Sequence, residues 1–250
     1  MERIKKIGAI IPLVLLVCAC SSDAKEKDSG RITFKTEDGF TIVGTLIRAE
    51  KEEGSPAIVL AHQLRSNRSE WEALMGLLKK EGVTTLAIDL RGHGESTDKN
   101  GKKIEWKEFS DSDFQGMATD IKTAVKYLVE NTKVDKAKIA LIGSSIGGNS
   151  ALRVLADDAK IRTVVALSPG LNYHSVTTED AVKKVTDRDM YLIAASGDEY
   201  STDSVNSLYE MNKARVTKEI ISGSKHGVPM FDDKPELKNK VVNWFKERLK

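Results

Sequence analysis

Short apolar runs separated by amphipathic stretches extend along the chain from residue 31. Residues 31–36 and 40–48 alternate apolar and polar positions on either side of Asp38-Gly39, a pattern typical of a β-hairpin. Continuous apolar runs of the length of a buried strand predict six more strands. These lie at residues 57–61, 83–88, 139–142, 163–167, 190–195 and 215–221.

Helical periodicity fills several of the intervals between these strands. A capping box at Ser69 and Glu72 predicts a helix that ends at Gly82. Further helices are predicted around residues 117–128, from about Ser145, and from Pro235 to the chain end. Strands that alternate with helices predict an α/β fold: a mainly parallel sheet of about eight strands with helices on both faces. Residues 169–188 are too few for a separate lid domain.

The first twenty residues differ from the rest. Basic residues (Arg3, Lys5 and Lys6) precede the apolar run 7–17, and Cys18-Ala19-Cys20 follows. This order is typical of a secretory signal and is too short for a stable transmembrane helix. The segment resembles the lipobox of bacterial lipoproteins, which predicts a signal peptide over 1–19 and a lipid on Cys20. Cleavage as an ordinary secreted protein, or retention as an uncleaved anchor, are the alternatives.

Cleavage would change the composition of the mature chain. The 39 basic and 37 acidic residues give a net charge of +2, and removal of 1–19 takes away three basic residues and one acidic residue. The remaining 36 of each give no support for nucleic-acid binding. Both cysteines lie before residue 21, which excludes disulfides and a thiol nucleophile from the mature domain. Residues 20–30 predict a lipidated tether to a membrane, and 31–250 the folded domain.

One motif carries candidate chemistry. The sequence Gly143-Ser144-Ser145-Ile146-Gly147 follows a predicted strand and begins a predicted helix. A serine on such a sharp turn is a nucleophile elbow, because glycines two residues to either side let neighbouring backbone approach. The N–H of Ile146 points from the helix N-terminus toward the same space. Ser145 is therefore the candidate nucleophile, with Ile146 in its oxyanion hole.

A serine nucleophile needs a base, and the base needs an orienting acid. His226 is the candidate base because it lies in a loop between the last strand and the terminal helix. Asp198 follows the strand at 190–195 and is the preferred acid, while Glu199 and Asp203 in the same loop remain alternatives. Together Ser145, Asp198 and His226 form a candidate catalytic triad.

Residues 31–250 resemble the α/β-hydrolases, in particular the lidless dienelactone hydrolase-like esterases. The order Ser145, Asp198, His226 is that of the family, and the runs 89–96 and 223–227 match its segments. Residues 60–64, Leu-Ala-His-Gln-Leu, resemble the turn that supplies the second oxyanion N–H. That resemblance implies Leu64 or Gln63 as the donor, since Gln63 stands where the family has glycine. It also implies structural roles for His62 and His93.

The sequence gives only weak signals for other binding residues. Tyr173 and His174 follow a predicted strand and could line a substrate site, although an exposed loop is equally compatible. Four scattered histidines without paired cysteines argue against a zinc site. Neither a phosphate loop nor a dinucleotide fingerprint is present, so we expect no cofactor.

The sequence thus predicts a serine hydrolase of carboxylic esters or thioesters, exported to the bacterial cell envelope and held at a membrane through Cys20. Its open site favours small or exposed acyl groups. A serine peptidase related to the prolyl oligopeptidases is the alternative, although those enzymes carry a large gating domain. A non-catalytic binding lipoprotein that kept the fold is a second alternative.

Overall fold

The computed structural model describes residues 30–250. The predicted signal peptide, the predicted lipidation site Cys20 and nearly all of the predicted tether lie outside these residues. No helix between residues 30 and 250 combines the length and the apolar character needed to cross a membrane.

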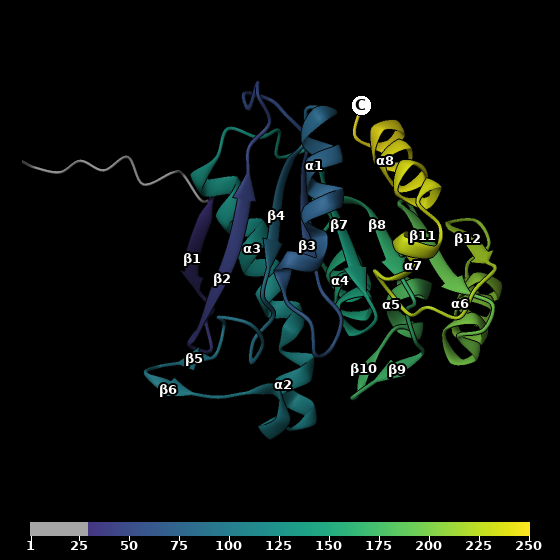
Figure 1. Ribbon diagram of the computed structural model, residues 1–250, viewed down its shortest axis with the longest axis horizontal. Coiled ribbons are helices and arrows are strands. Elements are labelled where there is room, and N and C mark those ends of the chain that lie inside the picture. The colour runs from purple at the N-terminus through teal and green to yellow at the C-terminus, as the bar shows by residue number, and fades with distance from the viewer. Residues whose placement is uncertain (1–29) are drawn as a thin grey trace, which may run out of the picture.

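A ten-stranded sheet forms the centre of the molecule (Figure 1). Its order is β12-β11-β8-β7-β3-β4-β2-β5-β6, and β1 pairs with β2. The strands are β1 (Arg31–Lys35), β2 (Phe40–Ile47), β3 (Ala57–Ala61), β4 (Thr84–Ile88), β5 (Asp98–Lys99), β6 (Lys102–Lys103), β7 (Ile139–Ser144), β8 (Ile161–Leu167), β11 (Asp189–Ala195) and β12 (Val216–Ile221). The six strands from β12 to β4 are mutually parallel, and the remaining pairs are antiparallel.

The eight predicted strands are therefore confirmed, and the sheet is larger than predicted by two. The added strands β5 and β6 are two residues each, polar and partly or fully exposed. Their sequence shows no apolar run because they lie at the sheet margin, where backbone pairing and polar contacts such as that of Thr41 Oγ1 with Asp98 Oδ2 at 2.8 Å hold them. A separate two-stranded sheet pairs β9 (Asn172–Tyr173) with β10 (Val176–Thr177), whose strands are equally short, although Val176 is buried in the core.

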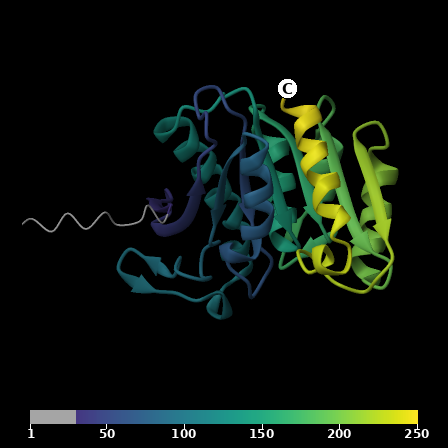
Figure 2. The ribbon, with the colours of Figure 1, turned by 45° about the horizontal axis from the view of Figure 1, so that its top comes forward.

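Helices cover both faces of the sheet, as predicted (Figures 1 and 2). One apolar cluster packs α1 (Glu72–Lys80), α7 (Met230–Asp233) and α8 (Glu236–Arg248) onto one face. The other cluster packs α2 (Asp111–Gln115), α3 (Met117–Asn131), α4 (Ile146–Asp157), α5 (Glu179–Lys184) and α6 (Glu199–Met211) onto the opposite face. The central strands are buried on both sides, which explains their continuous apolar sequences.

The start of the first helix differs from the prediction. A 3-10 turn, η1 (Arg68–Trp71), precedes α1, and a second, η2 (Trp106–Glu108), lies further on. Asn67, and not Ser69, caps the first turn, because its side chain accepts the Ser69 N–H at 2.9 Å. The predicted capping box of Ser69 with Glu72 is therefore wrong.

The strand order places the candidate chemistry at one edge of the sheet. β3 lies between β4 and β7, so the chain leaves β3 to one side and later returns to the other. The carboxyl ends of strands at such a switch point leave a crevice where α/β proteins bind ligands. Gln63 and Leu64 follow β3, and Ser145 follows β7, so they border this crevice.

Candidate active site

Ser145 occupies a strained turn between β7 and α4. Its backbone has φ 53° and ψ −122°, in the left-handed half of conformational space that non-glycine residues avoid. The Ser145 N–H donates to the Leu167 carbonyl oxygen of the adjacent strand at 2.8 Å, which helps to hold the turn. The side chain lies at the carboxyl edge of the sheet, and the residue is 6% exposed. This is the geometry of a nucleophile elbow.

Close backbone contacts explain the two glycines of the motif. A Cβ atom on Gly143 would collide with the Gly147 backbone. A Cβ atom on Gly147 would lie 2.5 Å from the carbonyl oxygens of both Ala61 and His62. The start of α4 therefore packs directly against the end of β3, where only glycine fits.

Asp198 and His226 meet as the sequence predicts. Asp198 is the residue before α6, at the carboxyl end of β11, and His226 lies between β12 and α7. His226 Nδ1 lies 2.7 Å from Asp198 Oδ2, so this nitrogen donates to the carboxylate. The arrangement leaves the other ring nitrogen, Nε2, available as a proton acceptor. The buried Ser201 places its Oγ 3.5 Å from the same Nδ1.

The neighbouring carboxylates take other positions. Glu199 and Asp203 lie on α6, after Asp198, and among residues 30–250 only the Asp198 carboxylate contacts His226. Asp189 begins β11 at the opposite edge and pairs with Arg215 and with Arg248. The contact therefore favours Asp198 over both alternatives.

Two contacts hold the His226 loop against the rest of the site. The Gly227 N–H donates to Ser168 Oγ at 2.9 Å, and Ser168 follows β8 with φ 48°. A Cβ atom on Gly227, which has φ 70°, would collide with Gln63 Oε1 and Ser144 Oγ. The carboxyl ends of β3, β7 and β8 therefore meet the loop after β12 at Gly227.

The loop after β3 is held by side chains from outside it. Gln63 donates its N–H to Glu70 Oε1 at 3.2 Å, and its own Oε1 accepts the Ser144 hydroxyl at 3.0 Å. Because the Gln63 N–H is engaged, Leu64 is the better placed of the two predicted oxyanion donors. Ser66 also donates to the Glu70 carboxylate. Burial raises the pKa of Glu70 to about 7, although these two hydrogen bonds oppose the shift.

His62 is a structural part of this loop. The buried ring donates from Nδ1 to the Gln63 carbonyl oxygen at 2.7 Å, and its Nε2 accepts the Leu90 N–H at 2.9 Å. Burial, with repulsion from His93, lowers the pKa of His62 to about 3, while the bond to Gln63 opposes the shift. A neutral imidazole whose two nitrogens are both engaged cannot act as a base here.

A pocket of about 240 Å³ collects these residues. Its lining consists of Gln63, Leu64, Ser145, Ile146, Tyr173, His174 and His226. The structure thus brings the predicted nucleophile, base, oxyanion donors and substrate-lining residues to one cavity. Tyr173 and His174 belong to the β9–β10 hairpin, whose two-residue strands gave no sequence signal. Ser201 was missed because a serine within a polar helical stretch carries no distinguishing pattern.

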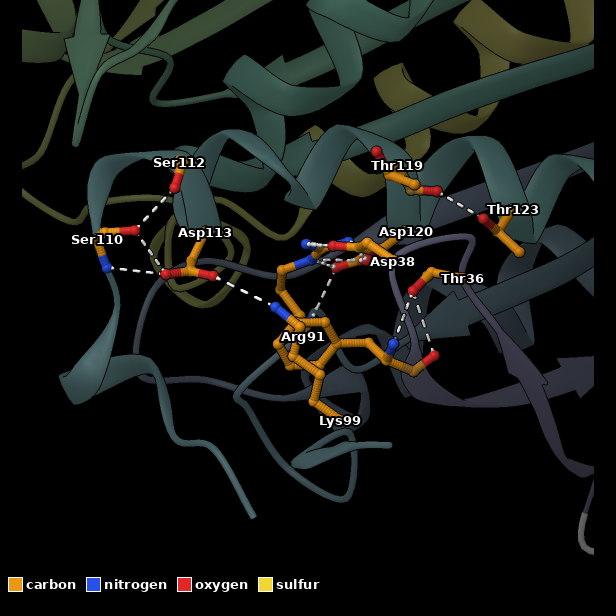
Figure 3. A network of polar contacts seen from close by, with 11 residues as sticks. Thr36, Asp38, Arg91, Lys99, Ser110, Ser112, Asp113, Thr119, Asp120 and Thr123 are labelled. Carbon is orange, nitrogen blue, oxygen red and sulfur yellow. Dashed lines mark hydrogen bonds and ion pairs between the residues drawn. The ribbon is translucent and has the colours of Figure 1, made fainter. Parts of the chain in front are cut away.

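Arg91 joins the segment after β4 to neighbouring elements of the fold (Figure 3). Its buried guanidinium donates to Asp120 of α3 at 2.8 and 2.9 Å, and to Asp38 of the β1–β2 turn at 2.6 and 3.1 Å. The Arg91 carbonyl oxygen contacts His93 Nδ1 at 2.9 Å, and the His93 ring lies 5.0 Å from that of His62. Burial lowers the pKa of His93, although Arg91 and Asp89 oppose the shift. These contacts give His93 the structural position that the resemblance implied.

The described residues, 30–250, show no candidate metal site. Within residues 30–250, no group of three or more His, Cys, Asp or Glu side chains is arranged to hold a metal ion.

The fold and the site define an α/β-hydrolase. The family described as serine aminopeptidase, S33, matches residues 52–226. This match covers more than half of the chain, so the chain belongs to that family of hydrolases. The matched segment runs from before β3 to His226 and so includes all three triad candidates.

Individual proteins show the same relationship at lower similarity. The uncharacterized protein YfhR of Salmonella typhimurium is 26% identical over 162 residues, which cover 59% of this chain and 51% of that protein. Esterase FrsA of Yersinia pestis is 25% identical over 204 residues, which cover 80% of this chain and 46% of that protein. The chain therefore spans about half the length of these curated relatives.

Solved structures share the fold over a greater length. An esterase of Pyrococcus furiosus, Pf2001, superposes with a TM-score of 0.73 at 22% identity, covering 88% of this chain and 91% of that one. Est1E of Butyrivibrio proteoclasticus, solved with ferulic acid, gives a TM-score of 0.69 at 20% identity, covering 87% and 98%. Both likenesses establish the α/β-hydrolase fold.

Proposed function

We propose that this protein is a serine hydrolase that cleaves carboxylic esters or thioesters through an acyl-enzyme. The observation that carries the proposal is the 2.7 Å contact of Asp198 with His226 at the pocket that Ser145 also lines. Ser145 attacks the acyl carbon, and His226 Nε2 takes its proton and returns it to the leaving group. The N–H groups of Ile146 and Leu64 stabilise the oxyanion.

The size of the pocket supports a preference for short acyl groups. About 240 Å³ is below the range of sites for drug-sized ligands. The interval between β8 and β11 holds the β9–β10 hairpin and α5 instead of an inserted lid domain. A panel of 4-nitrophenyl esters of increasing acyl length measures this preference, and we expect kcat/KM to fall beyond short chains.

Replacement of Ser145 tests the nucleophile. We expect Ser145→Ala to abolish ester turnover and labelling by a fluorophosphonate probe, because the substitution removes the attacking oxygen. Ser150→Ala is the matched control, since Ser150 is a buried serine of the same helix whose Oγ has no hydrogen-bond partner among residues 30–250. Labelling of Ser145→Ala at the wild-type rate would contradict the assignment. A folded wild type without labelling would favour a non-catalytic binding protein.

A peptidase is the second candidate, favoured by the description of the family as serine aminopeptidases. The same triad can cleave amides, but an amine is a poorer leaving group than an alcohol and needs firmer positioning of the substrate. Parallel assays with 4-nitrophenyl esters and with aminoacyl and prolyl 4-nitroanilides separate the two. Esters as the preferred substrates support the esterase; anilide hydrolysis with the higher kcat/KM supports the peptidase.

We also propose that the protein is exported and held at a membrane by a lipid on Cys20. The support is the basic, apolar and small-residue order of residues 1–20. Metabolic labelling with an alkynyl fatty acid tests it. We expect Cys20→Ala to lose the label and membrane association, whereas Cys18→Ala keeps both. Equal labelling of Cys20→Ala and wild type would refute this anchor.

A further inference from the structure

Tyr173 lines the pocket but has no part in the triad or the oxyanion hole proposed above. Its hydroxyl lies 3.1 Å from Ser201 Oγ and 3.3 Å from the Ser168 carbonyl oxygen. Its ring meets the His226 ring edge-on, with 6.2 Å between centroids and 86° between planes. The Ser145 side chain is near enough to the phenol to influence its ionisation. The phenol therefore lies beside both nucleophile and base.

The hydrogen bonds around Ser201 determine in which direction the Tyr173 hydroxyl donates its hydrogen bond. His226 Nδ1 donates to Asp198, so Ser201 Oγ, 3.5 Å away, can only accept from that nitrogen. The Ser201 hydroxyl proton is then available to Tyr173, and the Tyr173 proton is available to an acceptor beyond it. The acceptors on that side are the Ser168 carbonyl oxygen and Ser145 Oγ.

The β9–β10 hairpin holds Tyr173 in this position. His174 and Ser175 form its tip with φ 47° and 63°, a conformation that costs energy for residues other than glycine. The Ser175 N–H donates to Asn172 Oδ1 at 2.8 Å, and its hydroxyl donates to Asp111 Oδ2 of α2 at 2.6 Å. These contacts hold a strained turn in place, so the neighbouring tyrosine is positioned in advance.

The nucleophile helix is tied to the same hairpin. Asn149 of α4 is buried, donates from Nδ2 to the Val176 carbonyl oxygen at 2.7 Å, and accepts the Gly170 N–H at 3.0 Å. One side chain therefore fixes the hairpin relative to the helix that begins after Ser145.

The Tyr173 hydroxyl is protonated at neutral pH and can act as a hydrogen-bond donor. Burial raises the pKa of Tyr173 to about 12, with smaller raising effects from Asp198 and Tyr200, while Ser201 and Ser145 oppose the shift. At neutral pH the hydroxyl therefore keeps its proton and can donate a hydrogen bond to a developing negative charge without transferring the proton.

We propose that Tyr173 is a further catalytic residue, which donates a hydrogen bond to Ser145 Oγ as that oxygen leaves the acyl group. This role rests on the proposed function. In deacylation, water bonds to the acyl carbon and gives a proton to His226 Nε2. The carbon–Oγ bond then breaks, its electron pair goes to Oγ, and the proton passes from His226 to Oγ. Tyr173 keeps its own proton throughout.

The assignment to deacylation follows from the acceptor strength of Oγ. In the free enzyme Oγ belongs to a hydroxyl, which already accepts hydrogen bonds well. In the acyl-enzyme it is an ester oxygen, a weak acceptor, and it becomes a strong acceptor only as the bond breaks. Only an interaction that strengthens toward the transition state accelerates a step. The phenol therefore favours release of the acyl group more than attack by the serine.

Tyr173→Phe tests this role with 4-nitrophenyl acetate, whose good leaving group makes deacylation rate-limiting. We expect kcat to fall about tenfold, in keeping with the loss of one hydrogen bond to a charged group. We expect kcat/KM, which reports acylation, to stay within about twofold, so that KM falls with kcat. Rapid mixing should show a burst of one nitrophenolate per active site.

Tyr200→Phe is the matched control for loosening of the hairpin. The Tyr200 hydroxyl bonds to the backbone N–H and carbonyl oxygen of Asn172, both at 2.9 Å, and phenylalanine keeps the ring that contacts Tyr173, so the variant loses these two hairpin bonds and keeps the ring contact. We expect wild-type kcat from it. Ser201→Ala removes the group behind Tyr173 and should lower kcat in the same direction, which gives a second reading should Tyr173→Phe fold poorly.

The outcomes separate the two proposals. A wild type that forms the fluorophosphonate adduct, together with a Tyr173→Phe variant of unchanged kcat, overturns only the role of Tyr173. An equal fall in kcat and kcat/KM also overturns it, because the defect would then lie in acylation. Absence of the adduct in folded wild type overturns the proposed function and this role with it.

Discussion

Glu70 is a half-buried carboxylate beside the loop that follows β3. It accepts the Gln63 N–H and the Ser66 hydroxyl, and its pKa is raised to about 7 because burial outweighs both bonds. Between pH 4.5 and 7 the folded protein therefore holds a proton that the unfolded chain has lost. Stability from this group falls as pH rises through that window.

Replacing Glu70 with Gln removes this pH dependence while keeping an amide that can accept from Gln63. We expect the variant to gain stability relative to wild type as pH rises from about 4.5 to about 7, by at most about 3 kcal/mol. His62 titrates in the opposite sense, but it is present in both proteins and cancels in the difference. Urea unfolding across this range measures the effect, and a pH-independent difference would refute it.

The candidate active-site residues differ in how well the sequence alone identifies them. Ser145 and His226 were identifiable because a turn and a loop between known elements leave few candidates. Asp198 was the preferred acid from its place after the strand, but Glu199, which begins the next helix, stayed open until the contact of Asp198 with His226 was seen. The oxyanion donor needed them too, because only the contact with Glu70 shows that the Gln63 N–H is engaged.

At the scale of elements, Arg91 joins three segments of the fold. It follows β4 and binds Asp120 of α3 and Asp38 of the β1–β2 turn (Figure 3). Arg91 is 1% exposed and Asp120 is fully buried. Burial raises the pKa of Asp120 to about 6, although Arg91 opposes the shift by attraction and hydrogen bonding. The pair is thus desolvated and depends on both partners.

Asp120→Asn leaves the buried Arg91 charge with Asp38 as its one remaining ion-pair partner among residues 30–250. We expect the free energy of unfolding to fall by about 3 kcal/mol, the cost of removing one member of a buried ion pair. Asp157→Asn is the control, because that carboxylate pairs with Lys122 and Lys184 at the surface, where it is 49% exposed. Its loss should cost less than about 1 kcal/mol. Equal losses in urea unfolding would contradict the structural role of Arg91.

A helix whose buried face mixes polar and apolar residues was not predicted from the sequence. Helix α6 buries Ser201, Ser204, Val205 and Leu208, so small polar residues occupy half of its inner face. An apolar stripe is the signal that predicts an amphipathic helix, and here it is interrupted. Those same serines contact the β9–β10 hairpin, since Ser204 accepts the Leu171 N–H and Ser201 meets Tyr173.

Across the whole molecule, the parallel order of six strands brings distant loops to one edge. Residues after β3, β7, β8, β11 and β12 meet around Ser145, although they span 164 positions of sequence, from residue 63 to residue 226. Each of these strands ends in one loop at that edge. The site residues therefore come together only in this order of strands. This explains why the family match reaches from before β3 to His226.

Eight strands of the sheet, the helices α1, α3, α4 and α8, and the triad candidates could be predicted from the chain alone, because local periodicity and turn chemistry depend on neighbouring residues. The pairing of β5 with β2, the contact of Gln63 with Ser144, and the place of Tyr173 beside Ser145 were decided by tertiary contacts. These contacts join residues far apart in sequence. Such residues come together only when the strands have paired in their final order and the helices have packed on both faces of the sheet.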